Sequence, residues 1–307
     1  MSISTSHRQI LYGLTADSHF LNLLNQPKMT GKVEQVFNKA INVSIDNNLF
    51  TLLSCQLDNA PNSCRLINKD FALLQIKSGD DFYLLDKEIL IGERYSLSFS
   101  LCKKWQQPRI VFCPDKIKQK SYQSFLLAQL NTVDFILSNN NSSLFNYQGE
   151  NIFYLSSSVK LTQLRIRLIR LLKTKQHKNL VSTINQLVGL GIGLTPSGDD
   201  YLVGLMAFLL LENHPAHSFY PEFDQGIVQS KDRTTPISAI TLEKALKHEY
   251  RENIHQLIQS LVDVDETEIY SQFLEIFNIG SSSGSDMLFG IRDALYLTHY
   301  FGEKYVD

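Results

Sequence analysis

Residues 189–204 read GLGIGLTPSGDDYLVG, a glycine-rich turn that runs into two adjacent carboxylates and an apolar segment. Apolar residues at helical spacing precede it and end at Gly189, the residue type expected just past a helix end. Ser197 and Asp200 have the S-x-x-D spacing of an approximate capping box, and Asp199 and Asp200 fall in the first turn, where the helix dipole favours carboxylates. Residues 201–211, which follow, are apolar on nearly every face of the expected helix. The stretch therefore predicts a tight connection into a buried helix.

Two phosphate-binding motifs fail on this stretch. A P-loop needs a Lys after its last glycine, and no Lys follows Gly198. The dinucleotide fingerprint needs a third glycine where Pro196 stands, and it needs a strand where a helix is expected here. Neither nucleotide motif is therefore supported.

The pattern S-G-x-D-x-L-x-G occurs twice, at 197–204 and again at 283–290 within GSSSGSDMLFG. Each copy predicts a helix start with one glycine in the first turn and a second glycine six residues later. Glycine in a helix interior costs about 0.5–1 kcal/mol relative to Ala, so the second glycines indicate close helix–helix or backbone–ligand contact. One interpretation is a duplicated pair of packed core helices. The other is that both helix starts converge on one pocket.

Converging helix N-termini offer N–H groups and positive dipole ends that suit a small anion, and carboxylates there can orient a substrate amide or hold Mg²⁺. A charged loop, SKDRTTPIS at 230–238, supplies a cation for phosphate or carboxylate. The candidate catalytic residues are Asp199, Asp200, Asp286 and Arg233. The candidate substrate-binding residues are Gly191, Gly193, Thr195, Ser197, Gly198, Thr234, Thr235, Ser238, Ser283 and Gly284. A metal is not assigned, with the three aspartates as candidate Mg²⁺ ligands. Asp200 and Asp286 occupy matching positions, so we expect Asp199 to be the carboxylate freer for chemistry.

The rest of the chain predicts an α+β protein. Short runs with turns between them in the first third favour a β-rich barrel or sandwich, and expected strands include 41–45, 49–54, 71–77 and 109–113. Amphipathic stretches follow to the C-terminus. We therefore expect a β-rich domain over 1–117 and an α-helical domain over 118–307 that carries both motifs, with the boundary open between 114 and 158.

Composition narrows the class of protein. The 307 residues are 43% hydrophobic and carry a net charge of −2. A net charge this close to zero does not indicate a nucleic-acid or membrane partner. The longest apolar run, about ten residues, is too short to span a bilayer, and a signal peptide is not recognisable. Cys55, Cys64, Cys102 and Cys113 form no CxxC pair. We expect free thiols in a reducing, cytoplasmic compartment.

A basic run between 165 and 178 has two interpretations. Its cations fall between apolar positions, which is typical of the solvated face of an amphipathic helix. The alternative is a docking face for an acidic partner protein. The residues are Arg165, Arg167, Arg170, Lys173, Lys175 and Lys178.

GLGIGLTPSGDDYLVG, RTTPIS and GSSSGSDMLFG together resemble the AllH family, formerly a domain of unknown function. The looser N-terminal segments VFNKAINVSI, LFTLL, APNS and IGE are similar as well, so the resemblance runs over most of the chain. One departure is Ile192, where the family more often has Pro.

The resemblance implies a subunit of oxamate carbamoyltransferase, an enzyme of anaerobic allantoin and purine catabolism. With two partner subunits, the family's characterised member is assigned the conversion of oxalurate and phosphate to oxamate and carbamoyl phosphate. The S-T-R-T phosphate motif of familiar carbamoyltransferases is absent, and Arg233-Thr234-Thr235 matches that motif only in part. The alternatives are a non-catalytic assembly or regulatory subunit and a related carboxylase-like enzyme with another substrate.

Overall fold

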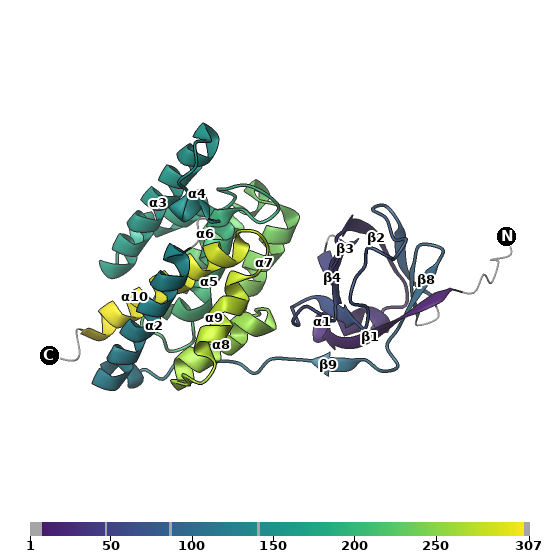
Figure 1. Ribbon diagram of the computed structural model, residues 1–307, viewed down its shortest axis with the longest axis horizontal. Coiled ribbons are helices and arrows are strands. Elements are labelled where there is room, and N and C mark those ends of the chain that lie inside the picture. The colour runs from purple at the N-terminus through teal and green to yellow at the C-terminus, as the bar shows by residue number, and fades with distance from the viewer. Residues whose placement is uncertain (1–7, 47, 86–87, 140–141, 304–307) are drawn as a thin grey trace. The chain divides into compact units, whose positions relative to one another are not determined.

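The computed structural model describes residues 8–46, 48–85, 88–139 and 142–303. The chain divides into two compact units, Met1–Pro108 and Arg109–Asp307. The first is a β-barrel and the second is built of helices, which confirms the α+β class (Figure 1). The domain limits at 117–118 stay a prediction, since the contacts divide the chain at 108–109.

The barrel closes because its first strand pairs with strands on both sides. The strands run in the order β5-β4-β3-β2-β6-β7-β8-β1, and the pairing of β5 with β1 closes the barrel. Strand β9 pairs with the second half of β1. Most neighbours are antiparallel, whereas β1–β8, β1–β9 and β4–β5 are parallel. The strands are β1 (Gln9–Asp17), β2 (Met29–Val36), β3 (Ala40–Ile45), β4 (Asn48–Ser54), β5 (Ser63–Leu66), β6 (Asp81–Leu85), β7 (Glu88–Ile91), β8 (Tyr95–Ser98) and β9 (Lys103–Trp105), with the short helix α1 (Ser18–Asn22) after β1.

Two expected strands are wrong. Residues 71–77 form turns and irregular structure in which the buried Phe71 and Leu74 anchor the segment to the barrel core, so the apolar run marks anchoring and not pairing. Residues 109–113 make only an isolated bridge between Val111 and Glu212.

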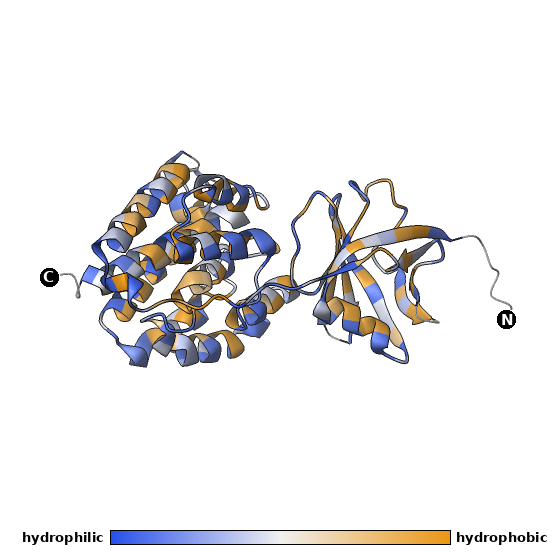
Figure 2. Ribbon diagram, turned by 90° about the horizontal axis from the view of Figure 1, so that it is seen from below, coloured by the Kyte–Doolittle hydropathy of each residue, from blue (hydrophilic) through white to orange (hydrophobic). Residues whose placement is uncertain are grey.

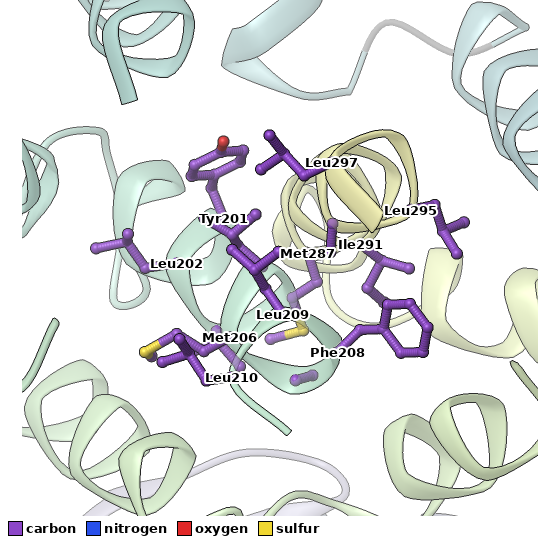
Figure 3. Packing of buried hydrophobic residues seen from close by; sticks show 14 of the residues in the cluster. Tyr201, Leu202, Met206, Phe208, Leu209, Leu210, Met287, Ile291, Leu295 and Leu297 are labelled. Carbon is purple, nitrogen blue, oxygen red and sulfur yellow. The ribbon is translucent and has the colours of Figure 1, made fainter. Parts of the chain in front are cut away.

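The helical unit surrounds a central pair, α5 (Ser197–Leu209) and α10 (Ser283–Glu303). Every residue of α5 is buried, as the apolar sequence predicts. Side chains including Tyr201, Phe208, Met287 and Ile291 fill the space around the pair (Figure 3). The other helices are α2 (Lys120–Ser138), α3 (Ile152–Lys173), α4 (Leu180–Leu187), α6 (Tyr220–Val228), α7 (Pro236–Leu246), α8 (Glu252–Asp263) and α9 (Ile269–Phe277).

Glycine lets the central helices cross in contact. A Cβ on Gly204 would lie 2.0 Å from the Met287 carbonyl oxygen, and one on Gly290 would lie 2.1 Å from the Tyr201 carbonyl oxygen. Any side chain at these two positions would strike backbone, which explains why the interior glycine of each S-G-x-D repeat is kept despite its cost in helix stability. The expected close helix–helix contact is confirmed.

The basic run is only partly a solvated face. Arg165 on α3 makes two bonds of 2.6 and 2.7 Å to the fully buried Asp293, which also accepts from the Tyr201 hydroxyl at 2.9 Å. The Lys173 ammonium lies 3.9 Å from the centre of the Tyr300 ring. These two cations therefore fix α3 to α10, whereas others such as Arg170 are exposed. Polar and apolar residues alternate along the helices accordingly (Figure 2). In the described part of the chain, no helix is both long enough and apolar enough to cross a membrane.

Candidate functional site

The site begins with the helix starts of the repeat. Pro196, not Ser197, is the N-cap of α5, so the capping-box interpretation is wrong and Ser197 is the first helical residue. Asp199 and Asp200 lie in the first turn of α5, as expected, and Asp286 lies in the first turn of α10. Proline at the cap leaves the Ser197 hydroxyl available for the interior of the site, where it lies near the Asp286 carboxyl and lowers its pKa.

The glycine-rich loop 189–195 holds the start of α5 against the preceding helix. Gly191 and Gly193 have φ values of +139° and +84°, a region that favours glycine. A Cβ on Gly198 would lie 2.1 Å from the Leu187 carbonyl oxygen, and one on Gly284 would lie 2.0 Å from that of Ile276. These predicted substrate-binding glycines therefore have a packing or turn role in the structure.

Asp199 binds the segment just before α7 and the end of the preceding helix. Its Oδ1 accepts a bond of 2.8 Å from the Gly189 amide, and its Oδ2 accepts from the Thr234 hydroxyl. Burial raises the pKa of Asp199, while Thr234, Gly189 and Ser238 oppose that rise. The expectation that Asp199 is the freer carboxylate is wrong, because both of its oxygens are held by the chain.

Asp200 and Asp286 lie in the first turns of α5 and α10 and are close enough to influence one another electrostatically. They are 2% and 0% exposed, and the Oδ2 atom of each has no hydrogen-bond partner among the residues that the structure describes. Burial and the nearby Asp286 raise the pKa of Asp200 well above its usual value. Burial raises the pKa of Asp286 to about 7, against the lowering effect of the Ser143 and Ser197 hydroxyls. Both carboxyls therefore keep a proton to a higher pH than an exposed aspartate does.

Hydroxyl groups surround this carboxyl pair. The Thr195 and Ser283 hydroxyls are 2.7 Å apart, and both lower the pKa of Asp200. Ser143, the N-cap of a short 3-10 helix at Leu144–Asn146, donates to Asp286 Oδ1. The Ser142 and Ser285 hydroxyls are 2.8 Å apart at the edge of the site. We define the dicarboxyl site as Asp200, Asp286, Thr195, Ser197, Ser283 and Ser143.

Sequence reasoning missed Ser143 because it stands 143 residues from Asp286, in an Asn/Ser-rich stretch outside both motifs. A short-range signal did exist, since Ser143 immediately precedes the apolar pair Leu144 and Phe145, and its hydroxyl accepts from the Phe145 amide at 2.9 Å. Serine before such a pair is a common helix start.

Arg233 is not part of the dicarboxyl site. It is exposed, and its Nη1 donates to the carbonyl and side-chain oxygens of Asn185 at 3.0 and 2.6 Å. The neighbouring Thr235 is the N-cap of α7 and accepts from the Ser238 amide at 3.2 Å, and Pro236 is the first helical residue. Arg233 as an anion ligand stays a prediction.

The backbone donors of the two helix starts are largely used within the chain. The Gly198 amide donates to Leu190 at 2.8 Å, the Gly284 amide to Ile279 at 2.9 Å and the Asp286 amide to Ser282 at 2.9 Å. The site thus presents carboxyl and hydroxyl groups more than free N–H groups. Such a set is suited to an amide or ureide, which offers both N–H donors and a carbonyl acceptor.

The three aspartates do not come together as one set of metal ligands in the described part of the chain. Over residues 8–46, 48–85, 88–139 and 142–303, groups of three or more His, Cys, Asp or Glu side chains arranged for a metal ion are absent. The reason is local: Asp199 is bound to Thr234 and Gly189, while Asp200 interacts with Asp286. The candidate Mg²⁺ ligand set is not assembled.

Two family profiles match the chain. The family described as oxamate carbamoyltransferase subunit AllH matches residues 187–295, which contain both S-G-x-D helix starts. The AllH family N-terminal domain matches residues 12–104, which make up nearly all of the barrel. No solved structure matches the chain.

Proposed function

Because the chain belongs to the AllH family of oxamate carbamoyltransferase subunits, we propose that its dicarboxyl site binds the carbamoyl end of oxalurate within the assembled enzyme. The observation that carries the proposal is the pair of buried carboxyl groups at Asp200 and Asp286, each with an unpartnered oxygen. Buried polar atoms are rarely left without partners, so two of them in one place point to a ligand.

The chemistry of the pair fits a carbamoyl group. An ionised carboxylate accepts from the carbamoyl NH₂, and a protonated carboxyl donates to the carbamoyl oxygen. In the transfer, a phosphate oxygen attacks the carbamoyl carbon, the bond from that carbon to the oxamate nitrogen breaks, and this nitrogen takes up a proton. A carboxyl whose pKa is about 7, as at Asp286, is matched to donating that proton near neutral pH.

Access to the pair passes the Thr195–Ser283 hydroxyl contact. Thr195 and Ser283 are partly exposed, whereas the carboxyls below them are buried. Thr195 follows the loop of Gly189, Gly191 and Gly193, whose positive φ values turn the chain sharply into α5. Arg233, on the other side of this loop, is proposed as the cation for the substrate carboxylate or for phosphate.

The test is carbamoyl phosphate formation from oxalurate and phosphate, by this chain alone and with its partner subunits. Asp200→Asn and Asp286→Asn keep the shape of each side chain, and we expect either change to lower kcat/KM by about 10²–10³-fold with assembly unchanged. The matched control is Asp232→Asn, an exposed carboxyl before α7. Unchanged turnover in both site variants would overturn the proposal.

A second candidate function is that of an assembly subunit whose partners carry the chemistry. An exposed apolar surface on α3 favours it, since four of its side chains are more than half exposed: Ile152, Phe153, Val159 and Ile166. The same assay separates the two functions. If the chain is an assembly subunit, Asp286→Asn leaves the activity of the complex unchanged. Activity is then lost only when the partner subunits no longer bind, which is the expected effect of Phe153→Asp on the exposed surface of α3.

A further inference from the structure

Two of the four cysteines meet beside the first strand of the barrel. Cys64 lies on β5 and is paired in register with Ala16 of β1. Cys102 directly precedes β9, whose residue Lys103 is paired with Thr15 on the opposite side of β1. The two cysteines thus approach the same short part of β1 from neighbouring strands, although 38 positions separate them in the sequence.

Gly13 provides the space in which the two sulfur atoms meet. A Cβ at Gly13 would lie 3.2 Å from the Sγ atom of Cys64 and 3.3 Å from the Sγ atom of Cys102. Both sulfurs therefore border the same point, on the face of β1 where a side chain is missing. The pairing of β1 with β5 shifts register between Gly13 and Thr15, and this irregularity brings the flanking strands together at the same place.

The two thiols differ in exposure and in acidity. Cys64 is fully buried, whereas Cys102 is partly exposed and follows Leu101, which is 65% exposed in a turn. The Cys64 thiol lowers the pKa of Cys102, while the contact with Cys102 and burial raise the pKa of Cys64. An accessible, more acidic thiol beside a second thiol is the arrangement found in oxidation-sensitive cysteine pairs.

We propose that Cys102 and Cys64 are a reversible oxidation site that forms an intramolecular disulfide with a peroxide as oxidant. The Cys102 thiolate attacks one peroxide oxygen, the O–O bond breaks, and hydroxide leaves with Cys102 as a sulfenic acid. The Cys64 sulfur then attacks the Cys102 sulfur, the S–O bond breaks, and the leaving hydroxyl and the Cys64 proton depart as water. The peroxide takes the two electrons that the two sulfurs lose. A dithiol reductant reverses the step by thiol–disulfide exchange.

The disulfide would join the two strands that flank β1 and enclose β6, β7 and β8 in a covalent loop. Cross-linking a loop of this kind restricts the unfolded chain, so the oxidised barrel resists unfolding more than the reduced one. Cys55 and Cys113, the remaining thiols, provide internal controls in the same molecule.

The experiment treats the full-length chain with hydrogen peroxide and follows free thiols, intact mass and linked peptides. The expected result is loss of two of the four thiols, a mass decrease of two hydrogen atoms, one peptide pair linked through Cys64 and Cys102, and full recovery with dithiothreitol. Four retained thiols, a linkage through Cys55 or Cys113, or disulfide-linked dimers would overturn the proposal.

Single variants test the division of roles between the two thiols. Cys102→Ser, at the partly exposed position, should leave Cys64 unoxidised, and a Cys55→Ser/Cys113→Ser variant should still form the linkage in full. Cys64→Ser should slow alkylation of Cys102 at neutral pH, because the thiol that lowers the Cys102 pKa is gone. An equal or faster alkylation rate contradicts the assigned pairing. Circular dichroism of each reduced variant verifies folding.

Discussion

Alanine at Gly290 should separate the central helices and destabilise the helical unit. The new Cβ would lie 2.1 Å from the Tyr201 carbonyl oxygen and 2.5 Å from the Leu205 amide nitrogen, both backbone atoms that cannot rotate away. Ordinary contact requires about 3.4 Å or more, so α5 and α10 must move apart by roughly 1 Å, and overpacking of this kind costs about 1–3 kcal/mol. Alanine returns about 0.5–1 kcal/mol through helix propensity. We expect a net loss of about 1 kcal/mol, and at most about 2.5 kcal/mol, in the free energy of unfolding.

Gly226→Ala is the matched control, because Gly226 also lies inside a helix, α6, and is buried. Its Cβ would meet Ile184 Cγ2 at 2.8 Å and Ile184 Cβ at 2.9 Å, but the nearest backbone atom, the Val181 carbonyl oxygen, would lie at 3.2 Å, so the backbone clash is much milder than at Gly290. Urea unfolding followed by far-ultraviolet circular dichroism measures both variants against the wild-type chain. Gly290→Ala should be clearly less stable than Gly226→Ala. Equal stability of the two variants would refute the proposed direct crossing of α5 and α10.

Three further predictions concern charge, pH and capping. Asp293→Ala leaves the Arg165 guanidinium, whose side chain is only 17% exposed, without its buried partner. We therefore expect a loss of about 3 kcal/mol in chemical unfolding, and a loss below about 1 kcal/mol would contradict the ion pair. Burial raises the pKa of Asp286 to about 7, so the unfolded state binds fewer protons than the folded state between about pH 4 and 7. As the pH rises through this range, the wild-type chain should lose up to about 1.4 kcal/mol of stability per pH unit relative to Asp286→Asn. Parallel curves of stability against pH for the two chains would count against the buried carboxyl. Asn151→Ala removes the side chain that accepts from two amides at the start of α3, which should cost about 1 kcal/mol in thermal or urea unfolding.

The helices were predictable where apolar spacing and the repeat agreed. The two S-G-x-D copies marked the starts of α5 and α10, and their interior glycines correctly indicated the crossing at Gly204 and Gly290. The barrel was predictable only as a β-rich region. Strand β1 lacks a clear alternation, and its parallel pairing with β8 joins residues more than eighty positions apart, which local pattern does not encode.

The site was predictable only in part, for the same reason. The repeat identified Asp200 and Asp286 as a matched pair, but it gave no sign that one oxygen of each would be buried without a hydrogen-bond partner. Asp199 appeared unpaired in the sequence, whereas Thr234 on a distant segment binds it. Arg233 was chosen for its charge, and the structure directs its guanidinium to Asn185. Side-chain partners set by tertiary packing decided each of these outcomes.

The most direct test of the central claim is equilibrium binding of oxalurate to the assembled complex, measured by calorimetry. If the dicarboxyl site holds the carbamoyl end, Asp286→Asn removes one charge-assisted or carboxyl hydrogen bond, and Kd should rise by about tenfold or more, while Asp232→Asn leaves it unchanged. The same Kd in wild type, Asp286→Asn and Asp200→Asn would contradict the claim that this chain binds the substrate between α5 and α10.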